Sequence, residues 1–366
     1  MLFKISRYFS KQTSQKTKQI FDREKHIINR QYALRTKIEN IFLKQSSITL
    51  ADNLSSIRKQ YDGNIAYFGQ GAAQFLQNLP NNLSPKTIYL CDLELDFLEY
   101  SLQQIQNDEQ LKGKFKILKV SEMTSQDNKT ILVPICCDED FWPFLDGHLQ
   151  LIVSNMNLHW VNDLQVVLIK WLESLEPDGT LVGSIFGSDT LQELRISYSL
   201  AENERFGGVS QHVSPFISIT EMGNLLTRLK FTLPTICTER NLYEFDSIYH
   251  LMQYIQDIGE GEALIQKRIG TFKQTIQSVS AIYESLFKNE NMKVNSTFEQ
   301  IYFSAWKYHE SQAKPKSRGS ATVSLQQLQK EIYQIAPEDK IIFGTLTEDD
   351  YQENIIKDEK GTKKKN

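Results

Sequence analysis

Polar and aromatic residues that could do chemistry gather where a short apolar segment ends. Residues 149–153 (LQLIV) are typical of a buried strand, and the residues after them include Asn155, His159 and Trp160. Ligands of open α/β proteins bind at the edge of the sheet where parallel strands end. An imidazole at that edge can act as a general base, so we expect catalytic roles for His159 and for Trp160 beside it. An ordinary strand-to-helix turn with packed side chains would give the same pattern.

A tight glycine turn follows another predicted strand. Gly69 and Gly71 come directly after the strand predicted for residues 64–68, and residues 72–79 are typical of a helix. Glycines let the backbone approach a ligand closely, and the start of a helix directs N–H groups at it. We therefore expect both glycines to contact a cofactor. Many strand-to-helix turns contain glycine for steric reasons alone, so this pattern is weak by itself.

Acidic residues stand after two further predicted strands. Residues 87–91 end at Asp92, about 20 residues beyond the glycines, where a carboxylate can accept hydrogen bonds from ribose hydroxyls. Residues 129–134 are followed by Asp138, which could meet the exocyclic amine of a purine. Asp92 could also cap the helix that follows it, and Asp138 could lie in a solvated acidic loop. We expect both residues to bind a nucleoside cofactor.

Alternating strand and helix patterns must position these residues. Between residues 64 and 186 the alternation predicts a doubly wound, mostly parallel α/β sheet. Helical patterns precede the sheet and also stand before the last predicted strand, at residues 20–42, 50–61, 246–258 and 262–286. The later two are typical of a lid over the sheet edge. The last predicted strand covers residues 297–308. Tyr308 at its end, and His309 after it, could reach the site if that strand lies beside it. Packing in the core is an equal alternative for both residues.

Charge and composition exclude several classes of protein. A net charge of −4 gives no basic field for nucleic acid, so we expect no nucleic-acid partner. No apolar segment approaches the ~20 residues that a membrane-spanning helix needs. The six histidines are scattered along the chain, and their spacing predicts no metal site.

The N-terminus is basic and rich in hydroxyl side chains, and no acidic residue stands before Asp22. This pattern fits a mitochondrial transit peptide better than a secretory signal; a merely basic, disordered start is the alternative. We divide the chain into a transit peptide (1–19), N-terminal helices (20–62), a cofactor-binding core (63–245), a helical insertion (246–296), a final strand with a C-terminal segment (297–345) and a disordered charged tail (346–366).

Several longer motifs resemble those of one family, the mitochondrial complex I assembly factor 5 proteins. They include IFDREKHIINRQYA, VSNMNLHWVNDL, GSDTLQELR and RGSATVS, and the likeness runs from about residue 20 to residue 326. The resemblance implies a Rossmann-like class I methyltransferase fold with S-adenosyl-L-methionine as cofactor. By position it assigns cofactor binding to Gly69, Gly71, Asp92 and Asp138. It places Asn155, His159 and Trp160 in the segment that flanks the reactive end of the cofactor.

The resemblance also implies a cellular role. Family members hydroxylate an arginine of a matrix-arm subunit, which makes that subunit the expected partner, and they assist the assembly of respiratory complex I. The implied location is the mitochondrial matrix, with peripheral association with the inner membrane and no transmembrane helix. An arginine substrate would be held by carboxylates, for which Asp189, Glu193 and Glu202 are candidates, although solvated charges on a helix face would look the same.

The chain departs from the methyltransferase pattern at two positions. Tyr67 stands where an acid usually precedes the glycines, and Ala73 replaces the third glycine. Loss of the acid removes a polar contact near the methionine end of the cofactor, whereas alanine at the third position is a mild change. Two other functions therefore stay open: methyl transfer to a protein or a small molecule, and a non-catalytic role as an assembly chaperone.

Overall fold

The computed structural model describes residues 19–36, 38–117, 129–265 and 273–314, together with a few positions between 319 and 327. The predicted transit peptide, apart from its last residue, and the predicted charged tail lie outside the described residues. The chain divides into two compact units, Met1–Gln312 and Ala313–Asn366, and every helix and strand named below belongs to the first unit.

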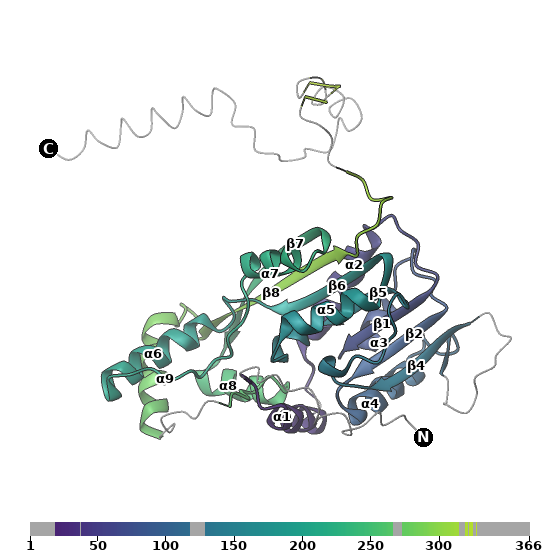
Figure 1. The fold of residues 1–366 in the computed structure, drawn as a ribbon. Helices are drawn as coiled ribbons and strands as arrows, with labels where there is room; N and C mark the ends of the chain where they lie inside the picture. Colours follow the sequence, from purple (N-terminus) through teal and green to yellow (C-terminus); the bar gives the residue numbers. More distant parts are fainter. Residues whose placement is uncertain are drawn as a thin grey trace. The chain divides into compact units, whose positions relative to one another are not determined.

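The described residues form an eight-stranded sheet with the order β3-β4-β2-β1-β5-β6-β8-β7 (Figure 1). Strands β1 to β6 run parallel, and β8 is antiparallel to β6 and β7. The strands are β1 Asn64–Gly69, β2 Thr87–Asp92, β3 Phe115–Ile117, β4 Thr130–Cys136, β5 Leu149–Asn155, β6 Leu175–Phe186, β7 Thr232–Phe245 and β8 Val294–Trp306. The predicted doubly wound, mostly parallel sheet is confirmed. The strand order reverses between β1 and β5, which is where open α/β sheets bind ligands.

Helices cover both faces of the sheet. Side chains alternate along each strand, so both faces carry apolar residues that the helices bury. Ile65 and Tyr67 of β1 pack in one apolar cluster, and Ala66 and Phe68 pack in another. The first cluster includes residues of α2 (Ile41–Ser55), α3 (Ala72–Gln77) and α4 (Leu95–Asn107). The second includes residues of α5 (Leu164–Ser174) and α7 (Ile219–Arg228). Apolar burial on both faces therefore fixes the strand ends that carry the predicted site.

The predicted N-terminal helical extension is present, but its helices have other boundaries. They are α1, Arg23–Thr36, and α2, Ile41–Ser55. Asn40 separates them, because its side chain accepts hydrogen bonds from the backbone N–H groups of Phe42 and Leu43 and so begins α2. As a result α1 and α2 are separate helices.

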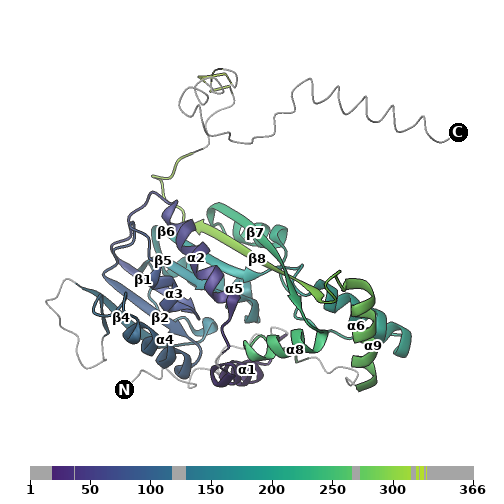
Figure 2. The same ribbon diagram turned by 180° about the vertical axis from the view of Figure 1, so that it is seen from behind.

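The predicted helical insertion before the last strand is confirmed. The helices α8 (Ile248–Asp257) and α9 (Lys273–Phe287) lie between β7 and β8 in the chain. Figure 2 shows α8 beside α1 at the lower edge of the sheet, and α9 beside α6 (Gln192–Phe206). Of the predicted lid, α8 therefore lies at the sheet edge, whereas α9 forms a helix pair with α6.

The last two strands are longer than the sequence pattern indicates, because they pair with each other over their whole length. Their register runs from Thr232 opposite Trp306 to Phe245 opposite Val294. Exposed residues alternate along much of β7, so only its first part has the apolar pattern of a strand. Residues 176–179 (EPDG), which are typical of a turn, lie within β6, where the register with β5 shifts.

Candidate functional site

The carboxyl edge of the sheet brings most of the predicted site residues together. β1 ends at Gly69 and β5 at Asn155, and these two residues are paired across the sheet. Asp92 ends β2, the other neighbour of β1. The remaining predicted residues at this edge follow β1, β4 and β5 directly, and they are Gly71, Asp138, His159 and Trp160.

The glycine turn packs closely against the protein itself. Gly69 has φ +106° and Gly71 has φ +78°, which are conformations that favour glycine. A Cβ atom at position 69 would clash with the carbonyl oxygen of Asn155. A Cβ atom at position 71 would lie 2.9 Å from Oγ of Ser47 and 3.0 Å from Nδ2 of Asn155. The internal packing of the turn therefore requires both glycines, whether or not a ligand also approaches them.

Asn155 is completely buried, and its amide group is used internally. The hydrogen-bond partners of its side chain are the hydroxyls of Ser46, Ser47, Tyr67 and Ser184 and the carbonyl oxygen of Gln70. An amide has two N–H donors and two oxygen lone pairs, so no capacity is left for a cofactor. The prediction that the Asn155 side chain binds the cofactor is wrong. Its hydrogen bonds link the glycine turn to α2 and to the strands β5 and β6.

Asp92 is buried and forms an ion pair with α1. Its Oδ2 lies 2.8 Å from a terminal nitrogen of Arg30, and each of the two side chains is only 4% exposed. Its Oδ1 accepts a hydrogen bond from the backbone N–H of Glu94 at 3.0 Å, which supports the start of α4. In the amide orientation that satisfies its hydrogen bonds, Gln70 accepts from Arg30 at 2.9 and 3.2 Å. The guanidinium group of Arg30 therefore spans the gap from the glycine turn to Asp92.

The contacts of Arg30 and Asp92 bear on whether a nucleoside cofactor fits at this edge. Ribose hydroxyls would need an oxygen of Asp92 and the space beside the glycine turn. Arg30 holds that oxygen and also lies over the ring of Phe97, with 4.2 Å between its Cζ atom and the ring centroid. The residue types at this edge suit a nucleoside, but in this conformation Arg30 lies against the carboxylate that the ribose hydroxyls would need.

A second basic residue of α1 holds the acidic loop after β4. Arg23 forms an ion pair with Glu139 and lies 3.4 Å from Oδ1 of Asp138. Asp138 also accepts a hydrogen bond from the backbone N–H of Asp140 and begins the short 3₁₀ helix η1 (Glu139–Phe141). Burial raises the pKa of Glu139 to about 7, and the charge of Arg23 opposes that rise. The sequence pattern singled out Asp138, whereas the deeply buried acid of this loop is Glu139.

His159 is buried in the short 3₁₀ helix η2 (Leu158–Trp160) and is held by an acid from outside the core. Its Nε2 and the Nε1 of Trp160 each lie 3.0 Å from the same carboxylate oxygen of Glu260. A carboxylate only accepts hydrogen bonds, so Nε2 carries a proton, and in the neutral form of the ring Nδ1 is an acceptor. Among the described residues, Nδ1 has no hydrogen-bond partner.

Aromatic rings pack around the ring of His159. The His159 ring lies 5.0 Å from the ring of Phe186 and 6.1 Å from that of Phe216, between ring centroids. Trp160 stacks on His26 of α1 at 4.2 Å. Burial, followed by the neighbouring positive charges, lowers the pKa of His26 well below its ordinary value of 6.5. The predicted pair His159 and Trp160 is thus placed together at the edge, while Glu260 and His26 had no signal in the sequence spacing.

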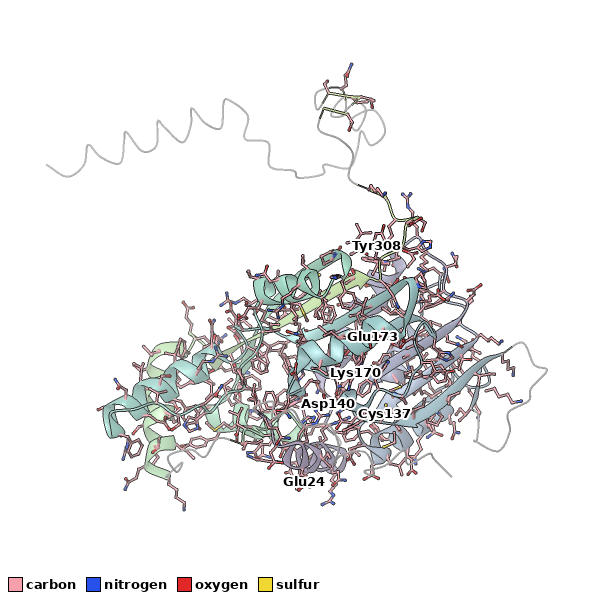
Figure 3. All side chains as sticks on the ribbon, viewed as in Figure 1. Glu24, Cys137, Asp140, Lys170, Glu173 and Tyr308 are labelled. Atoms are coloured by element: carbon pink, nitrogen blue, oxygen red, sulfur yellow. The ribbon has the colours of Figure 1, made fainter. Side chains whose placement is uncertain are left out.

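Tyr308 does not reach this site, so the prediction of a catalytic role for it is wrong. β8 runs antiparallel to β6, with Trp306 opposite Thr180 near the amino end of the parallel strands. Tyr308 follows at that opposite edge and is 59% exposed. Figure 3 shows it at the far end of the sheet from Asp140. His309 lies beside it, with its Nδ1 atom 2.7 Å from the hydroxyl oxygen of Ser311.

The predicted arginine-binding carboxylates have other partners. Glu193 is buried and accepts a hydrogen bond from the backbone N–H of Thr297 at 2.9 Å. Glu202 is buried and pairs with His212. Both residues hold α6 in place, and the prediction that they bind an arginine substrate is wrong. Asp189 is exposed and lies 3.2 Å from Arg240.

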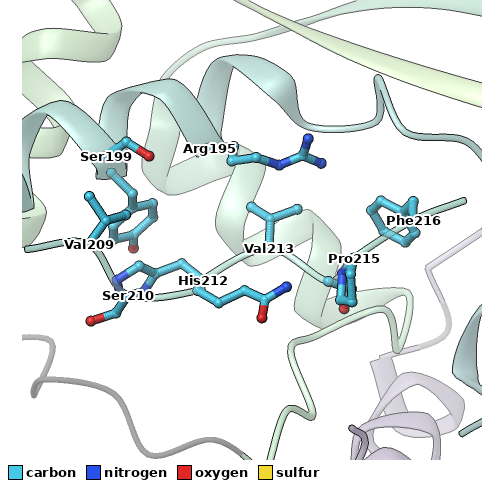
Figure 4. Close-up of a pocket in the computed structure, with 11 residues that line it drawn as sticks. Arg195, Ser199, Val209, Ser210, His212, Val213, Pro215 and Phe216 are labelled. Carbon is cyan, nitrogen blue, oxygen red and sulfur yellow. The ribbon is translucent and has the colours of Figure 1, made fainter. Parts of the chain in front are cut away.

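A pocket of about 430 Å³ lies between α6 and residues 209–216 (Figure 4). Arg195 and Tyr198 of α6 line one side, and Phe216 lies at one end. The ring of Phe216 also packs 6.1 Å from that of His159, between ring centroids, so Phe216 both lines the pocket and neighbours the His159 ring. No acidic residue lines this pocket in the described part of the chain.

Two kinds of feature are absent from the residues that the structure describes. No cluster of three or more histidine, cysteine, aspartate or glutamate side chains is arranged to hold a metal ion there. In the same part of the chain, no helix has both the length and the apolar character that crossing a membrane requires.

Comparison with known proteins identifies a domain and several relatives. Residues 67–183 match the family model of a methyltransferase domain. The human protein named arginine-hydroxylase NDUFAF5, mitochondrial, is 34% identical over 87% of this chain and 86% of its own length. The protein of the same name from Dictyostelium discoideum is 47% identical over 48% of this chain and 41% of its own length. A malonyl-[acyl-carrier protein] O-methyltransferase from Xylella fastidiosa is 33% identical over 45% of this chain and 54% of its own length.

Proposed function

The chain belongs to the family of the mitochondrial arginine-hydroxylase NDUFAF5, and on that premise we propose that it modifies an arginine side chain of a protein during assembly of respiratory complex I. The proposed modification is hydroxylation, the activity for which the relatives are named. The proposed substrate is a subunit of the matrix arm of complex I. The relatives are named mitochondrial, and location in the matrix, with peripheral contact with the inner membrane, belongs to the same proposal.

The orientation of His159 is the observation that carries this proposal. Glu260 holds the Nε2–H group, and Nδ1 has no hydrogen-bond partner among the described residues, so in the neutral ring Nδ1 presents a lone pair. A guanidinium group carries five N–H donors and no acceptor, and it stacks on aromatic faces. An arginine side chain that donates to Nδ1 beside Phe186 therefore complements this position in both hydrogen bonding and shape. In this role His159 holds the substrate, and it can take up a proton from it.

The pocket next to Phe216 supports a route for the substrate. Its volume of about 430 Å³ is in the range of small-ligand sites, roughly 300–1,000 Å³. Phe216 lines this pocket and lies beside the ring of His159, so in this proposal it moves aside when an arginine passes from the pocket to His159. Because the lining has no acid, the charged head of the substrate would be held at the far end, where Glu260 lies beside His159.

The methyltransferase domain supports S-adenosyl-L-methionine as the cofactor. When bound, this cofactor supplies an activated methyl group. Its proposed binding residues are Gly69, Gly71, Asp92 and Asp138, at the edge where open α/β sheets bind ligands. Binding there requires Arg30 to leave Asp92. Hydroxylation inserts one oxygen atom into a C–H bond, so that reaction also consumes dioxygen and electrons from a donor.

Methyl transfer to arginine is the second candidate function. It is favoured by the match of residues 67–183 to a methyltransferase domain. The role of His159 would be the same, because Nδ1 can accept the proton that the guanidinium nitrogen loses when it is methylated. The two reactions differ in the mass that they add to the substrate.

Mass spectrometry of matrix-arm subunits from cells that lack the chain tests the proposal. We expect one arginine-containing peptide to lose the mass of one oxygen atom, and to regain it when the wild-type chain is restored. Loss of the mass of one methylene group would establish methyl transfer in place of hydroxylation. If every arginine peptide keeps its mass while complex I fails to assemble, the protein acts as an assembly chaperone and the proposed modification is refuted.

A further inference from the structure

Helix α1 lies across the carboxyl edge of the sheet and directs basic side chains into it. Its two buried residues are His26 and Arg30. Arg23, one turn earlier, has a side chain that is only 18% exposed. The buried face of α1 therefore carries two guanidinium groups, and His26 lies between them in the sequence. Withdrawal of the helix would return little apolar surface to water, but the buried carboxylates that it pairs with would then need other donors.

We propose that α1 is a displaceable plug of the cofactor cleft, in which Arg30 occupies the nucleoside position and a nucleoside cofactor binds only when Arg30 leaves Asp92. This inference rests on the proposed function, since it concerns the same cleft. It explains why a sheet edge with a glycine turn and a strand-end acid is filled by a side chain of the protein itself. It also assigns a role to the N-terminal helix, which lies outside residues 67–183 of the matched domain.

The chemistry of Asp92 makes the exchange possible. The Arg30 guanidinium donates to Oδ2 of Asp92 at 2.8 Å and, in the satisfied amide orientation, to Gln70 in the glycine turn. Ribose hydroxyls are also donors and can take the place of the guanidinium at the carboxylate. Asp92 is 3% exposed, and a buried carboxylate without a partner is unstable. Arg30 thus supplies a hydrogen-bond donor to the Asp92 carboxylate when no cofactor is bound. When a cofactor binds, its ribose hydroxyls can take over the place of the guanidinium N–H group.

The plug itself leaves several hydrogen-bonding groups unsatisfied. Nε of Arg23, Nδ1 of His26 and NH1 of Arg30 are buried and have no hydrogen-bond partner among the described residues. Buried polar groups without partners weaken a packed contact. These three atoms belong to the same face of one helix, so the docked position of α1 is less stable than a fully satisfied one. That difference lowers the free energy needed to withdraw the helix.

Other contacts attach α1 to the end of α8 and to the segment that follows it. Asn29 donates to the carbonyl oxygen of Gly261 at 2.8 Å, and Thr36 donates to that of Asp257 at 2.8 Å. The same segment carries Glu260, which orients His159. Helix α1 and residues 257–264 therefore pack as a joint cover over the cofactor position and the position of the proposed substrate.

Calorimetric titration with S-adenosylhomocysteine tests the plug. In Arg30→Gln the competing charge is gone, and we expect tighter binding than in the wild type. The gain is about tenfold if the wild-type helix is withdrawn a tenth of the time. Arg35→Gln is the matched control, because Arg35 lies on the same helix and is exposed; it should bind as the wild type does. A wild-type affinity equal to or tighter than that of Arg30→Gln would overturn the plug.

A second measurement avoids any loss of stability in the variant. Hydrogen exchange of the wild-type chain should become faster in residues 23–36 when S-adenosylhomocysteine saturates it. Unchanged or slower exchange in α1 would refute displacement even if Arg30→Gln failed to fold. If neither the wild type nor Arg30→Gln bound S-adenosylhomocysteine, the proposed cofactor would be refuted together with the plug. Binding by the wild type without any gain in Arg30→Gln would refute the plug alone.

Discussion

Replacing Glu260 with glutamine should release His159 from its single tautomer and slow the arginine modification by roughly 10- to 100-fold. The Glu260 carboxylate accepts hydrogen bonds from both His159 and Trp160, each at 3.0 Å. A glutamine amide can accept from one of them, but its NH₂ group then faces the other donor. A hydrogen bond to a charged group contributes about 1.5–3 kcal/mol, and a factor of ten in rate corresponds to about 1.4 kcal/mol.

Nitrogen-15 NMR of the imidazole measures the first effect independently of any substrate. In the wild type we expect the proton on Nε2 and a lone pair on Nδ1, because the carboxylate of Glu260 only accepts. In Glu260→Gln both tautomers should be populated, since the amide can donate to Nε2 as well as accept from it. The modification rate is then followed by mass spectrometry of the matrix-arm arginine peptides.

Glu262→Gln provides the matched control in the same segment. Glu262 lies 2.9 Å from Lys25, and the side chains of Glu262 and Lys25 are 13% and 44% exposed, respectively. Glu262 also accepts a hydrogen bond from the backbone N–H of Leu264 at 2.8 Å, and the oxygen of a glutamine can still accept it. We expect no change in the tautomer of His159 and no loss of modification. The reasoning about Glu260 is refuted if Glu260→Gln keeps the wild-type tautomer and the wild-type rate, or if Glu262→Gln reduces both as strongly.

Three further outcomes follow from the geometry. Because the pKa of His26 lies well below its ordinary 6.5, the unfolded chain binds a proton that the folded chain does not. The free energy of unfolding should therefore fall as the pH drops below about 6.5, and thermal melts should show a weaker pH dependence in His26→Phe. Gly69→Ala should lower the free energy of unfolding by about 2–4 kcal/mol in urea denaturation, through a positive φ and a clash with the carbonyl oxygen of Asn155. Gly207→Ala, whose added Cβ meets nothing within 4 Å, should cost only about 1–2 kcal/mol. Tyr308→Phe should leave both stability and arginine modification unchanged, since Tyr308 is 59% exposed at the opposite edge; a reduced modification rate would contradict that placement.

The sheet and its carboxyl edge could be predicted because they depend on local patterns. Short apolar segments such as residues 149–153 end in polar residues, and parallel strands place such ends together. The glycine turn and Asp92 therefore meet at one edge, as predicted. Parallel strands that are buried on both faces have nearly continuous apolar sequences, so their existence and order along the chain were visible.

The closure of this edge could not be predicted, because it depends on contacts between residues far apart in the chain. Arg30 and Asp92 are 62 positions apart, and His159 and Glu260 are 101 apart. Nothing in the spacing of charged residues distinguishes Arg30 from the other basic residues of α1. The local pattern was also ambiguous for Asp92, which is both a strand-end acid and a support for the next helix.

The end of β8 was misjudged for a different reason. An alternating pattern predicts a strand but carries no information about its direction in the sheet. The antiparallel pairing of β8 with β6 places Tyr308 at the opposite edge. The acids of α6 were similarly visible as charges, but only the packed structure shows that Glu193 and Glu202 are buried and paired within the protein.

Replacement of the chain by His159→Gln in cells tests the central claim most directly. Glutamine can donate to Glu260 as Nε2 does, but it places no acceptor where Nδ1 lies. With the variant present at wild-type levels, the matrix-arm arginine peptide should carry no added oxygen or methyl mass. A fully modified arginine in these cells would show that Nδ1 of His159 takes no part in the reaction, and would contradict the proposed active site.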